Sequence, residues 1–305
     1  MLAIVIPYYK YDFFEATLQS LAAQTNKQFH VYIGDDASPK PPTDLLLKFQ
    51  GQFSFSYHRF ESNLGGTSLV QQWNRCLNLA QNETWVQILG DDDVIGNNVV
   101  ASFYENLPEI EDIKSSVIRF ATQVIDEKGN PISTIYQHPK LELATDFLLR
   151  KFKGGTRSSL SEYFFKKEKI NAIQLKDFPL AWYSDLLAVV EFAEFKTIYT
   201  INTAVVNFRL SGQNITSRTG DELVKNQATF SFYLYLLKHH GKNFSSELVQ
   251  LLFDRLEKTV LDNKKQLKTW MQLFYLYLVF FQVKRFLLLS LKIKKSIILQ
   301  RNPPI

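Results

Sequence analysis

Residues 2–33 have the sequence LAIVIPYYKYDFFEATLQSLAAQTNKQFHVYI, and this stretch decides the fold. It begins with an apolar run at 2–6 and ends with a second at 29–33 that is rich in β-branched and aromatic residues, as buried parallel strands are. Between the runs, apolar residues recur at helical spacing over 14–22, behind Asp12 as a candidate N-terminal cap. The order strand, helix, strand predicts a βαβ unit.

The same alternation continues to about residue 107. Residues 53–57 and 85–89 are further strand candidates, and 67–80 can form a helix with its apolar side chains on one face. Strands that alternate with helices predict an α/β chain with an open, doubly wound and mostly parallel sheet, Rossmann-like in its first half. Sheets of this type bind ligands beyond the carboxyl ends of their strands.

Beyond residue 110 the pattern changes to an α+β-like order, and the last third is helical. The expected elements are a strand at 117–125 followed by a turn through Pro131, a helix at 141–152, a β pair at 198–201 and 204–208, and helices at 221–240 and 244–260. We therefore divide the chain into an α/β part, 1–218, with halves 1–110 and 111–218, and a helical C-terminal region, 219–305.

The composition indicates a globular protein that can bury a sizeable core. Of the 305 residues 46% are hydrophobic and 21% are charged, which excludes a disordered or fibrous chain. The single cysteine, Cys76, has no nearby base and is interpreted as a buried structural thiol. The N-terminal residues 1–7 lack a basic leader and reach a proline early, unlike a signal peptide, so we expect a cytoplasmic protein.

Two acidic clusters follow predicted strands. Asp35 and Asp36 come directly after the second strand, and Asp91–Asp93 follow the strand at 85–89. Three successive carboxylates repel one another, and a divalent cation would offset their charge. Oxygen ligands of this kind suit Mg²⁺ or Mn²⁺, which could then bridge the phosphates of a departing nucleoside diphosphate. A single cluster could equally cap a helix or lie in a solvated loop, but two at strand ends favour a functional site.

Several segments follow, in order and spacing, the pattern of family-2 glycosyltransferases. They are residues 4–9, 18–21, 24–25, 35–38, 63–65 and 90–93. The resemblance covers about the first 110 residues. It implies the nucleotide-binding half of a GT-A fold, a nucleotide diphosphate-sugar donor such as a UDP-sugar, and Mn²⁺ or Mg²⁺ as the cofactor.

The resemblance also implies roles for individual residues. It places Pro7, Tyr8 and Tyr9 beside the base and ribose, Asp35 or Asp36 in hydrogen bonds to base or ribose, Gly65 along the donor cleft, Asp91 against the donor, and Asp92 and Asp93 at the metal. The family's metal-binding aspartate aligns best with Asp92. Because the first acid of the usual motif falls on Gly90, Asp93 and Asp91 could instead support the site from beside it.

Glycosyl transfer with inversion needs a base that takes the proton of the acceptor hydroxyl. The stretch 182–185 is similar to the one in which these enzymes carry that base, so Asp185 is the candidate. The alternative role for Asp185 is to cap the helix predicted directly after it.

Two small-residue loops carry an arginine. Similar enzymes have a mobile segment after the final core strand, which here would hold Arg209 with Asn214 and Ser217. The guanidinium of Arg209 could contact the donor phosphates, or it could pair at the surface. For Arg157, in the loop 154–159, surface pairing is the favoured interpretation.

The tail combines an aromatic, apolar run at 270–283 with basic residues such as Lys284 and Arg285. The run is too short to span a bilayer, which needs about twenty residues. We expect an amphipathic helix lying in the headgroup region of an anionic membrane. The alternatives are packing on the α/β part or a homodimer interface.

The function predicted from these features is inverting transfer of a sugar to a saccharide or lipid-linked saccharide, in bacterial-type cell-surface polysaccharide (capsule or O-antigen) synthesis. The enzyme would be peripheral on the inner face of the cell membrane. A non-catalytic nucleotide-sugar-binding scaffold at the membrane is the alternative. A nucleotidyltransferase is disfavoured because residues 7–10 contain no glycine-rich phosphate loop, and no aromatic-basic pattern indicates nucleic-acid binding.

Overall fold

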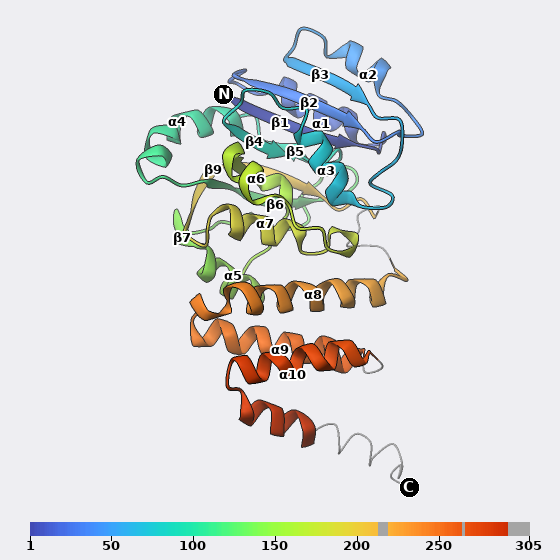
Figure 1. The fold of residues 1–305 in the computed structure, drawn as a ribbon. Helices are drawn as coiled ribbons and strands as arrows, with labels where there is room; N and C mark the ends of the chain where they lie inside the picture. The colour runs from blue at the N-terminus through green and yellow to red at the C-terminus, as the bar shows by residue number, and fades with distance from the viewer. Residues whose placement is uncertain (213–218, 264–265, 292–305) are drawn as a thin grey trace. The chain divides into compact units, whose positions relative to one another are not determined.

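The computed structural model describes residues 1–212, 219–263 and 266–291. The chain divides into two compact units, the first covering Met1–Asp221 and the second beginning at Glu222. The first unit is built on one large sheet, and the second consists of helices (Figure 1). The prediction of an α/β fold followed by a helical region is confirmed.

The sheet is parallel in its first half and mixed in its second. The strands are β1 (Leu2–Tyr8), β2 (Phe29–Asp35), β3 (Ser54–Arg59), β4 (Trp85–Ile88), β5 (Val94–Ile95), β6 (Val117–Ile125), β7 (Leu141–Leu143), β8 (Tyr163–Lys166) and β9 (Thr197–Arg209). Their order is β3-β2-β1-β4-β8-β6-β9-β5, with β7 also paired to β9. β1 to β4 run parallel, whereas β8 is antiparallel to both of its neighbours. The carboxyl ends of β1, β2 and β4 therefore meet at one edge.

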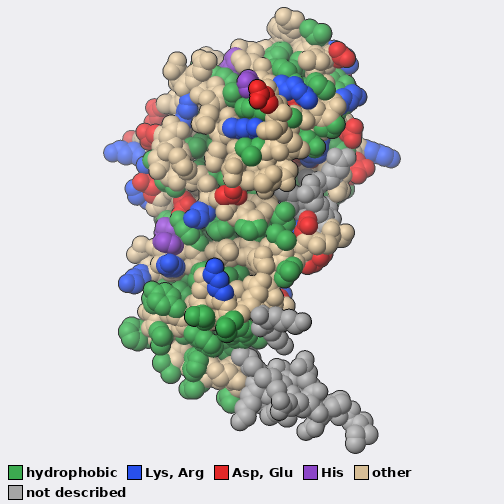
Figure 2. Space-filling view, turned by 45° about the vertical axis from the view of Figure 1, so that its right-hand side comes forward, with side chains coloured by type: hydrophobic (Ala, Val, Ile, Leu, Met, Phe, Trp, Pro, Cys, Tyr) green, Lys and Arg blue, Asp and Glu red, His purple; other side chains and the backbone are tan. Residues whose placement is uncertain are grey.

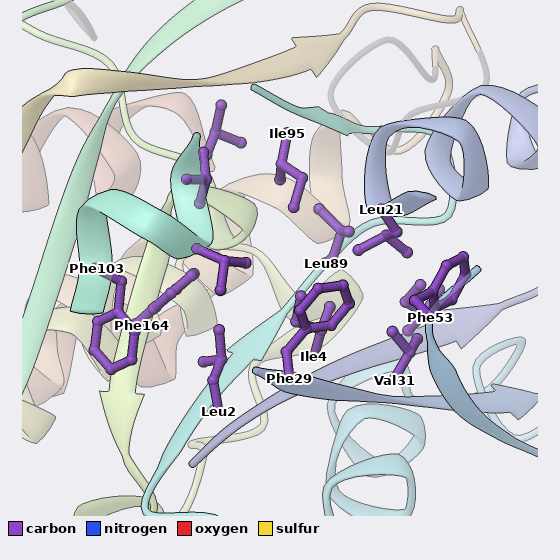
Figure 3. Packing of buried hydrophobic residues seen from close by; sticks show 14 of the residues in the cluster. Leu2, Ile4, Leu21, Phe29, Val31, Phe53, Leu89, Ile95, Phe103 and Phe164 are labelled. Atoms are coloured by element: carbon purple, nitrogen blue, oxygen red, sulfur yellow. The ribbon is translucent and has the colours of Figure 1, made fainter. Parts of the chain in front are cut away.

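Helices cover both faces of the parallel half. The helices of the first unit as a whole are α1 (Phe14–Ala22), α2 (Thr43–Lys48), α3 (Leu69–Leu77), α4 (Val99–Asp112), α5 (Ala144–Phe152), α6 (Lys167–Ile173) and α7 (Ser184–Phe192). Alternate residues of β1 and β2, such as Ile4 and Val31, join Leu21 of α1 and Phe103 of α4 in one apolar cluster (Figure 3). α3 contacts β1 and β2, and Val5, on the other face of β1, is also buried. Burial on both faces explains the continuous apolar runs of these strands.

The structure corrects three local predictions. Residues 198–208 do not form a β pair, because β9 is one strand beside β6 and absorbs the extra residues in a register shift between Phe120 and Ala121. Helix α1 begins after Phe13, which makes no side-chain capping hydrogen bond, so Asp12 is not the N-cap. β8 was not predicted, although it joins the two halves of the sheet.

The second unit contains α8 (Glu222–His240), α9 (Ser246–Asp262), α10 (Leu267–Val279) and a helix at 283–291. α8, α9 and α10 pack on one another through buried side chains that include Leu236, Phe253 and Leu273. Within the described part of the chain, no helix is both long and apolar enough to cross a membrane.

Candidate active site

The strand order brings the two acidic clusters to opposite sides of the end of β1. Asp35 is the last residue of β2, and Asp91–Asp93 follow β4 after a short connection. Because β1 lies between these strands, the segment that leaves it, Tyr9 and Lys10, passes directly beside the second cluster. Five carboxylates are thus gathered at one edge of the sheet, and each is at least 95% buried. The hydrogen bonds and ion pairs of each carboxylate determine which of its oxygens can bind a ligand.

Asp35 is neutralised entirely within the protein. Its Oδ2 accepts hydrogen bonds from the Tyr57 hydroxyl (2.6 Å) and from Arg59 Nη1 (2.7 Å), and its Oδ1 accepts one from the backbone N–H of Ser38 (2.7 Å). Desolvation together with the neighbouring Asp35 carboxylate raises the pKa of Tyr57 to about 12. The side chain of Asp35 is completely buried, so the structure places it beneath the edge rather than facing solvent.

Asp36 holds the loop that precedes α3. It forms an ion pair with Arg75 and accepts hydrogen bonds from the backbone N–H groups of Leu64 (2.7 Å) and Gly65 (2.9 Å). A Cβ atom at Gly65 would lie 2.5 Å from Asp36 Oδ2, so glycine permits this close approach. Gly65 is therefore held against Asp36, and the Arg75 guanidinium lies 3.9 Å from the centroid of the Phe60 ring.

Asp91 fixes the chain as it leaves β1. Its Oδ2 accepts hydrogen bonds from the backbone N–H groups of Tyr9 (2.8 Å) and Lys10 (2.7 Å), and its Oδ1 lies 3.4 Å from Lys10 Nζ. Burial raises the pKa of Asp91, while Lys10 and the two backbone donors act in the opposite direction. These contacts make Asp91 a support for the segment 9–10.

Asp92 differs from its neighbours because one of its oxygens remains open. Oδ2 is ion-paired with Lys10 Nζ and accepts a hydrogen bond from the Ser211 hydroxyl (3.2 Å). Oδ1 accepts no hydrogen bond from the residues that the structure describes. Asp92 is thus the member of the triplet with an oxygen available to a ligand.

Asp93 has both of its carboxylate oxygens in hydrogen bonds within the protein. Its Oδ2 accepts a hydrogen bond from the Ser161 hydroxyl, and its Oδ1 accepts one from the backbone N–H of Arg209 (2.9 Å). Burial, with the nearby Asp92 charge, raises the pKa of Asp93 to about 7. A Cβ atom at Gly90 would lie 2.9 Å from Asp93 Oδ2 and 3.2 Å from Asp92 Oδ1, so both carboxylates lie close against this glycine.

Arg209 is the buried last residue of β9, so it does not lie in a loop as predicted, and its contact with the donor stays a prediction. Its Nε donates to the backbone carbonyl of Asp92 (2.8 Å), and its Nη1 donates to those of Asp126 and Glu127 (3.0 Å each). The residue is only 3% exposed. The turn after β6 contributes carbonyl oxygens that need donors, and Arg209 supplies them. Asn214 and Ser217, predicted to act with it, lie outside the described residues.

The residues that end β1 occupy different environments. Tyr8 is fully buried, donates its hydroxyl hydrogen to the backbone carbonyl of Lys40 (2.6 Å) and packs on Phe14, so its side chain does not line the surface. Pro7 is partly buried within the strand, and Tyr9 is 42% exposed. Of these three predicted donor contacts, Tyr9 presents the most side-chain surface.

Asp185 lies at the start of α7, after Tyr183 in a left-handed backbone conformation (φ 68°). Its carboxylate accepts hydrogen bonds from the backbone N–H groups of Leu186 and of Asp185 itself. Desolvation raises the pKa of Asp185, and Arg157 opposes this rise. The same Arg157 is ion-paired with Glu162 (3.1 Å). Its charge also acts against the rise in the pKa of Asp93, so it affects both acids.

Lys10, Arg59, Arg75 and Ser161 were not singled out from the sequence. Arg59 was within reach of that reasoning, because the parallel register pairs it with Asp35 at the ends of adjacent strands. Lys10 follows directly on the first strand, and a cation there could have been matched to the acids of a neighbouring strand. Ser161 was not accessible because β8, which it precedes, was not predicted.

The described residues contain no group of three acid, histidine or cysteine side chains that could hold a metal ion by themselves. The donor set nevertheless fits Mg²⁺ or Mn²⁺ in one way. These ions are commonly bound by one or two carboxylates together with phosphate oxygens of the substrate. Asp92, with its open Oδ1, is the residue that would hold such an ion.

Solved structures with a similar fold are glycosyltransferases of the GT-A class. S. aureus TarS 1-349 in complex with UDP-GlcNAc matches at a TM-score of 0.64 and 16% identity, over 90% of this chain and 79% of that one. GalNAc-T7 with UDP, GalNAc and Mn²⁺ matches at 0.53 and 12%, over 85% and 56%. Mannosyltransferase PcManGT from Pyrobaculum calidifontis with GDP-Man and Mn²⁺ matches at 0.51 and 13%, over 99% and 81%. The fold is that of a GT-A glycosyltransferase.

The sequence places the chain more narrowly within this class. Residues 3–164, more than half of the chain, match the family model described as Glycosyl transferase family 2. The chain belongs to glycosyl transferase family 2. No curated protein matches its sequence.

Proposed function

We propose that this protein transfers a sugar from a nucleotide diphosphate-sugar, with a UDP-sugar as the expected donor, to a saccharide or lipid-linked saccharide, with inversion. The observation that carries the proposal lies at the edge between β2 and β4. Among the described residues, Asp92 Oδ1 is the one carboxylate oxygen of the two clusters with neither a hydrogen bond nor an ion pair. Similar folds have been solved with UDP-GlcNAc and with GDP-Man, which supports a nucleotide-sugar donor. The product would belong to a cell-surface polysaccharide such as a capsule or O-antigen.

The donor half, 1–110, would bind the nucleotide between the ends of β1, β2 and β4. Tyr9 offers an exposed ring to the base, and Gly65, in the loop that Asp36 holds, would lie along the donor cleft. Asp35 and Asp36 act by keeping this edge rigid, because their oxygens are already engaged. The half 111–218 would bind the acceptor.

The diphosphate would lie beside Asp92. A divalent ion bound there would neutralise the negative charge that develops on the leaving diphosphate. Asp92 would hold the ion through its open oxygen, while Asp91 and Asp93 hold the backbone on either side of it through their contacts with residues 9–10 and Arg209. We therefore propose that Asp93 supports the metal site rather than ligating the ion.

Asp185 is the proposed base that takes the proton of the acceptor hydroxyl. Its pKa is raised by desolvation, and a carboxylate whose pKa lies closer to neutrality is a stronger base than an ordinary aspartate. The backbone N–H of Leu186 and the charges of Lys151 and Arg157 act against that rise in the pKa. These roles fit an in-line displacement, which inverts the anomeric carbon.

A thermal-shift panel tests donor binding. UDP, GDP, CDP and dTDP, each with and without Mn²⁺, are added to the full chain, and one nucleotide with Mn²⁺ should raise the melting temperature most, because ligands stabilise the state they bind. Absence of any shift across the panel would refute the donor site.

Donor turnover separates an enzyme from the alternative, a nucleotide-sugar-binding scaffold. With the preferred nucleotide sugar and Mn²⁺, the wild type should release nucleoside diphosphate in the presence of an acceptor. Asp185→Asn should lose transfer and keep the thermal shift, since the base does not bind the nucleotide. Binding without release by the wild type would favour the scaffold.

We propose that the second unit lies against an anionic membrane. One face of α10 is exposed and apolar over successive turns at Leu267, Met271, Tyr275 and Leu278, which we call the α10 stripe. Figure 2 shows hydrophobic side chains gathered on the visible face of this unit. Lys284 and further basic residues in the remaining sequence add the charge that anionic headgroups attract. The chain would then meet a lipid-linked acceptor as a peripheral protein, and a homodimer through the stripe is the alternative.

Sedimentation with phosphatidylglycerol vesicles tests this contact. Met271→Glu with Leu278→Glu should weaken binding at least about tenfold, because two apolar side chains lose their burial in the membrane. Leu47→Glu is the matched control, since Leu47 is 68% exposed in the first unit. Equal sedimentation of both variants would refute membrane contact, and a change from dimer to monomer in the double variant would indicate the homodimer.

A further inference from the structure

Lys10 places an internal cation against the acidic triplet. Its ammonium is ion-paired with Asp92 Oδ2 and lies 3.4 Å from Asp91 Oδ1. The Lys10 side chain is 25% exposed, whereas the side chains of both aspartates are 6% exposed. One charge of the triplet is therefore offset by the protein itself, at the carboxylate that is proposed to hold the metal ion.

The ammonium and a divalent cation would compete for the same carboxylate. Oδ2 of Asp92 is engaged by Lys10 and Ser211, so only Oδ1 remains for an ion. Two cations on one carboxylate repel each other strongly where water is largely excluded. A negatively charged diphosphate relieves this repulsion, because its oxygens can accept both the ammonium and the ion.

We infer that the Lys10 ammonium keeps a divalent ion from binding at Asp92 until the donor binds. Without nucleotide, the ammonium occupies the carboxylate and opposes metal binding. When a nucleoside diphosphate is bound, its phosphates give the ammonium a second partner, and Asp92 becomes available to the divalent ion. Metal and nucleotide thus bind together rather than in sequence. This inference rests on the proposed use of Asp92 and adds a positioning role for Lys10.

Titration of the full chain with Mn²⁺, followed by the electron paramagnetic resonance signal of the free ion, tests the inference. In the absence of nucleotide, Lys10→Met should bind Mn²⁺ at least tenfold more tightly than the wild type. Addition of UDP should increase Mn²⁺ affinity more in the wild type than in Lys10→Met. Lys48→Met makes the same charge change at an exposed ion pair with Glu15 and should bind Mn²⁺ as the wild type does.

An unchanged or weaker Mn²⁺ affinity in Lys10→Met would overturn the inference. Lys10→Arg keeps a cation and should bind Mn²⁺ as weakly as the wild type; tight binding by this variant would also overturn it. If a thermal melt shows that Lys10→Met does not fold, Lys10→Gln replaces it with the same expectation. Tight Mn²⁺ binding by the wild type alone would refute only the role of Lys10, whereas failure of UDP with Mn²⁺ to bind the wild type would refute the proposed function.

Discussion

The two acidic clusters lie at one edge of the same sheet, and their carboxylates are neutralised in different ways. Asp35 and Asp36 are matched to Arg59 and Arg75, and backbone N–H groups occupy their remaining oxygens. Asp92 is paired with Lys10, two residues after β1, and its Oδ1 has no partner among the residues that the structure describes. Each arginine reaches its aspartate through one nitrogen and donates through others to a second group, Ser38 for Arg59 and Gln72 for Arg75, which fixes its position. An ammonium is a point charge that can change partners. The first cluster is thus built for rigidity and the second for exchange of ligands.

Asp92→Asn should have the largest effect, on turnover. Loss of the negative charge removes the proposed ligand of the divalent ion, and kcat should fall about a thousandfold or more. The melting temperature should change little, because Asn can keep the contact with Ser211 and Lys10 keeps Asp91 as an ion-pair partner. The control is Asp146→Asn, an exposed aspartate in the first turn of α5. If the kcat of Asp92→Asn lay within threefold of that of the control, Asp92 would not be the residue that holds the ion.

Asp36→Ala should act on stability instead. Removing one partner of a largely buried ion pair leaves Arg75 and two backbone N–H groups without their acceptor, at a cost of about 3 kcal/mol. The free energy of unfolding from urea titration measures this loss. Glu15→Gln breaks an exposed pair with Lys48 and should cost less than about 1 kcal/mol. Similar losses in the two variants would show that the first cluster is not a rigid support.

Gly65→Ala should disturb the loop held by Asp36 to a smaller extent. The added Cβ would meet the Asp36 carboxylate, and overpacking of this kind costs about 1–3 kcal/mol. Because the loop borders the proposed donor site, affinity for UDP should fall as well. Gly51→Ala is unsuitable as a control because of its positive φ, so Gly66→Ala, with a Cβ position 3.0 Å from the flexible Asn63 side chain, is used. UDP affinity is measured by calorimetry. Equal affinities of Gly65→Ala and the wild type would show that the loop does not border the donor site.

The smallest effect is expected at His138, which lies among arginines outside the two acidic clusters and should change the pH dependence of stability. Burial, together with Arg119, Arg150 and Arg157, lowers the pKa of His138 to about 2. The ordinary pKa of histidine is 6.5, so below that pH the unfolded chain binds a proton at His138 that the folded chain binds only near pH 2. The contribution of neutral His138 to the free energy of unfolding is therefore present above pH 6.5 and is lost as the pH falls toward 2. The slope from one group is at most about 1.4 kcal/mol per pH unit.

Urea titrations from pH 7 to 4.5 check this expectation. His138→Gln should flatten the slope by the contribution of one proton, while His58→Gln, on β3, should not. An identical pH dependence in the His138 variant and the wild type would assign the acid sensitivity to other groups. In either case donor binding at pH 7 should be unchanged, because His138 belongs to neither acidic cluster.

Much of the donor half could be predicted because its signals are local. Buried strands such as β1 are continuous apolar runs, and residues at the ends of parallel strands share one edge whatever the rest of the chain does. The second half was predicted less well, because β8 is four residues long and the bulge in β9 resembles a turn when its partner is unknown. A bulge depends on the register of two strands, which no local pattern contains.

The sequence by itself determined the fold class, the positions of both acidic clusters and the resemblance to family-2 glycosyltransferases, because strand periodicity and motif order are properties of neighbouring residues. Only the tertiary structure decided which carboxylates are closed by arginine, serine or backbone donors and which one stays open. Lys10 and Asp92 are 82 positions apart, as are Asp91 and Tyr9. Partners at that separation are set by strand order, and the burial and hydrogen bonding of each acid follow from them.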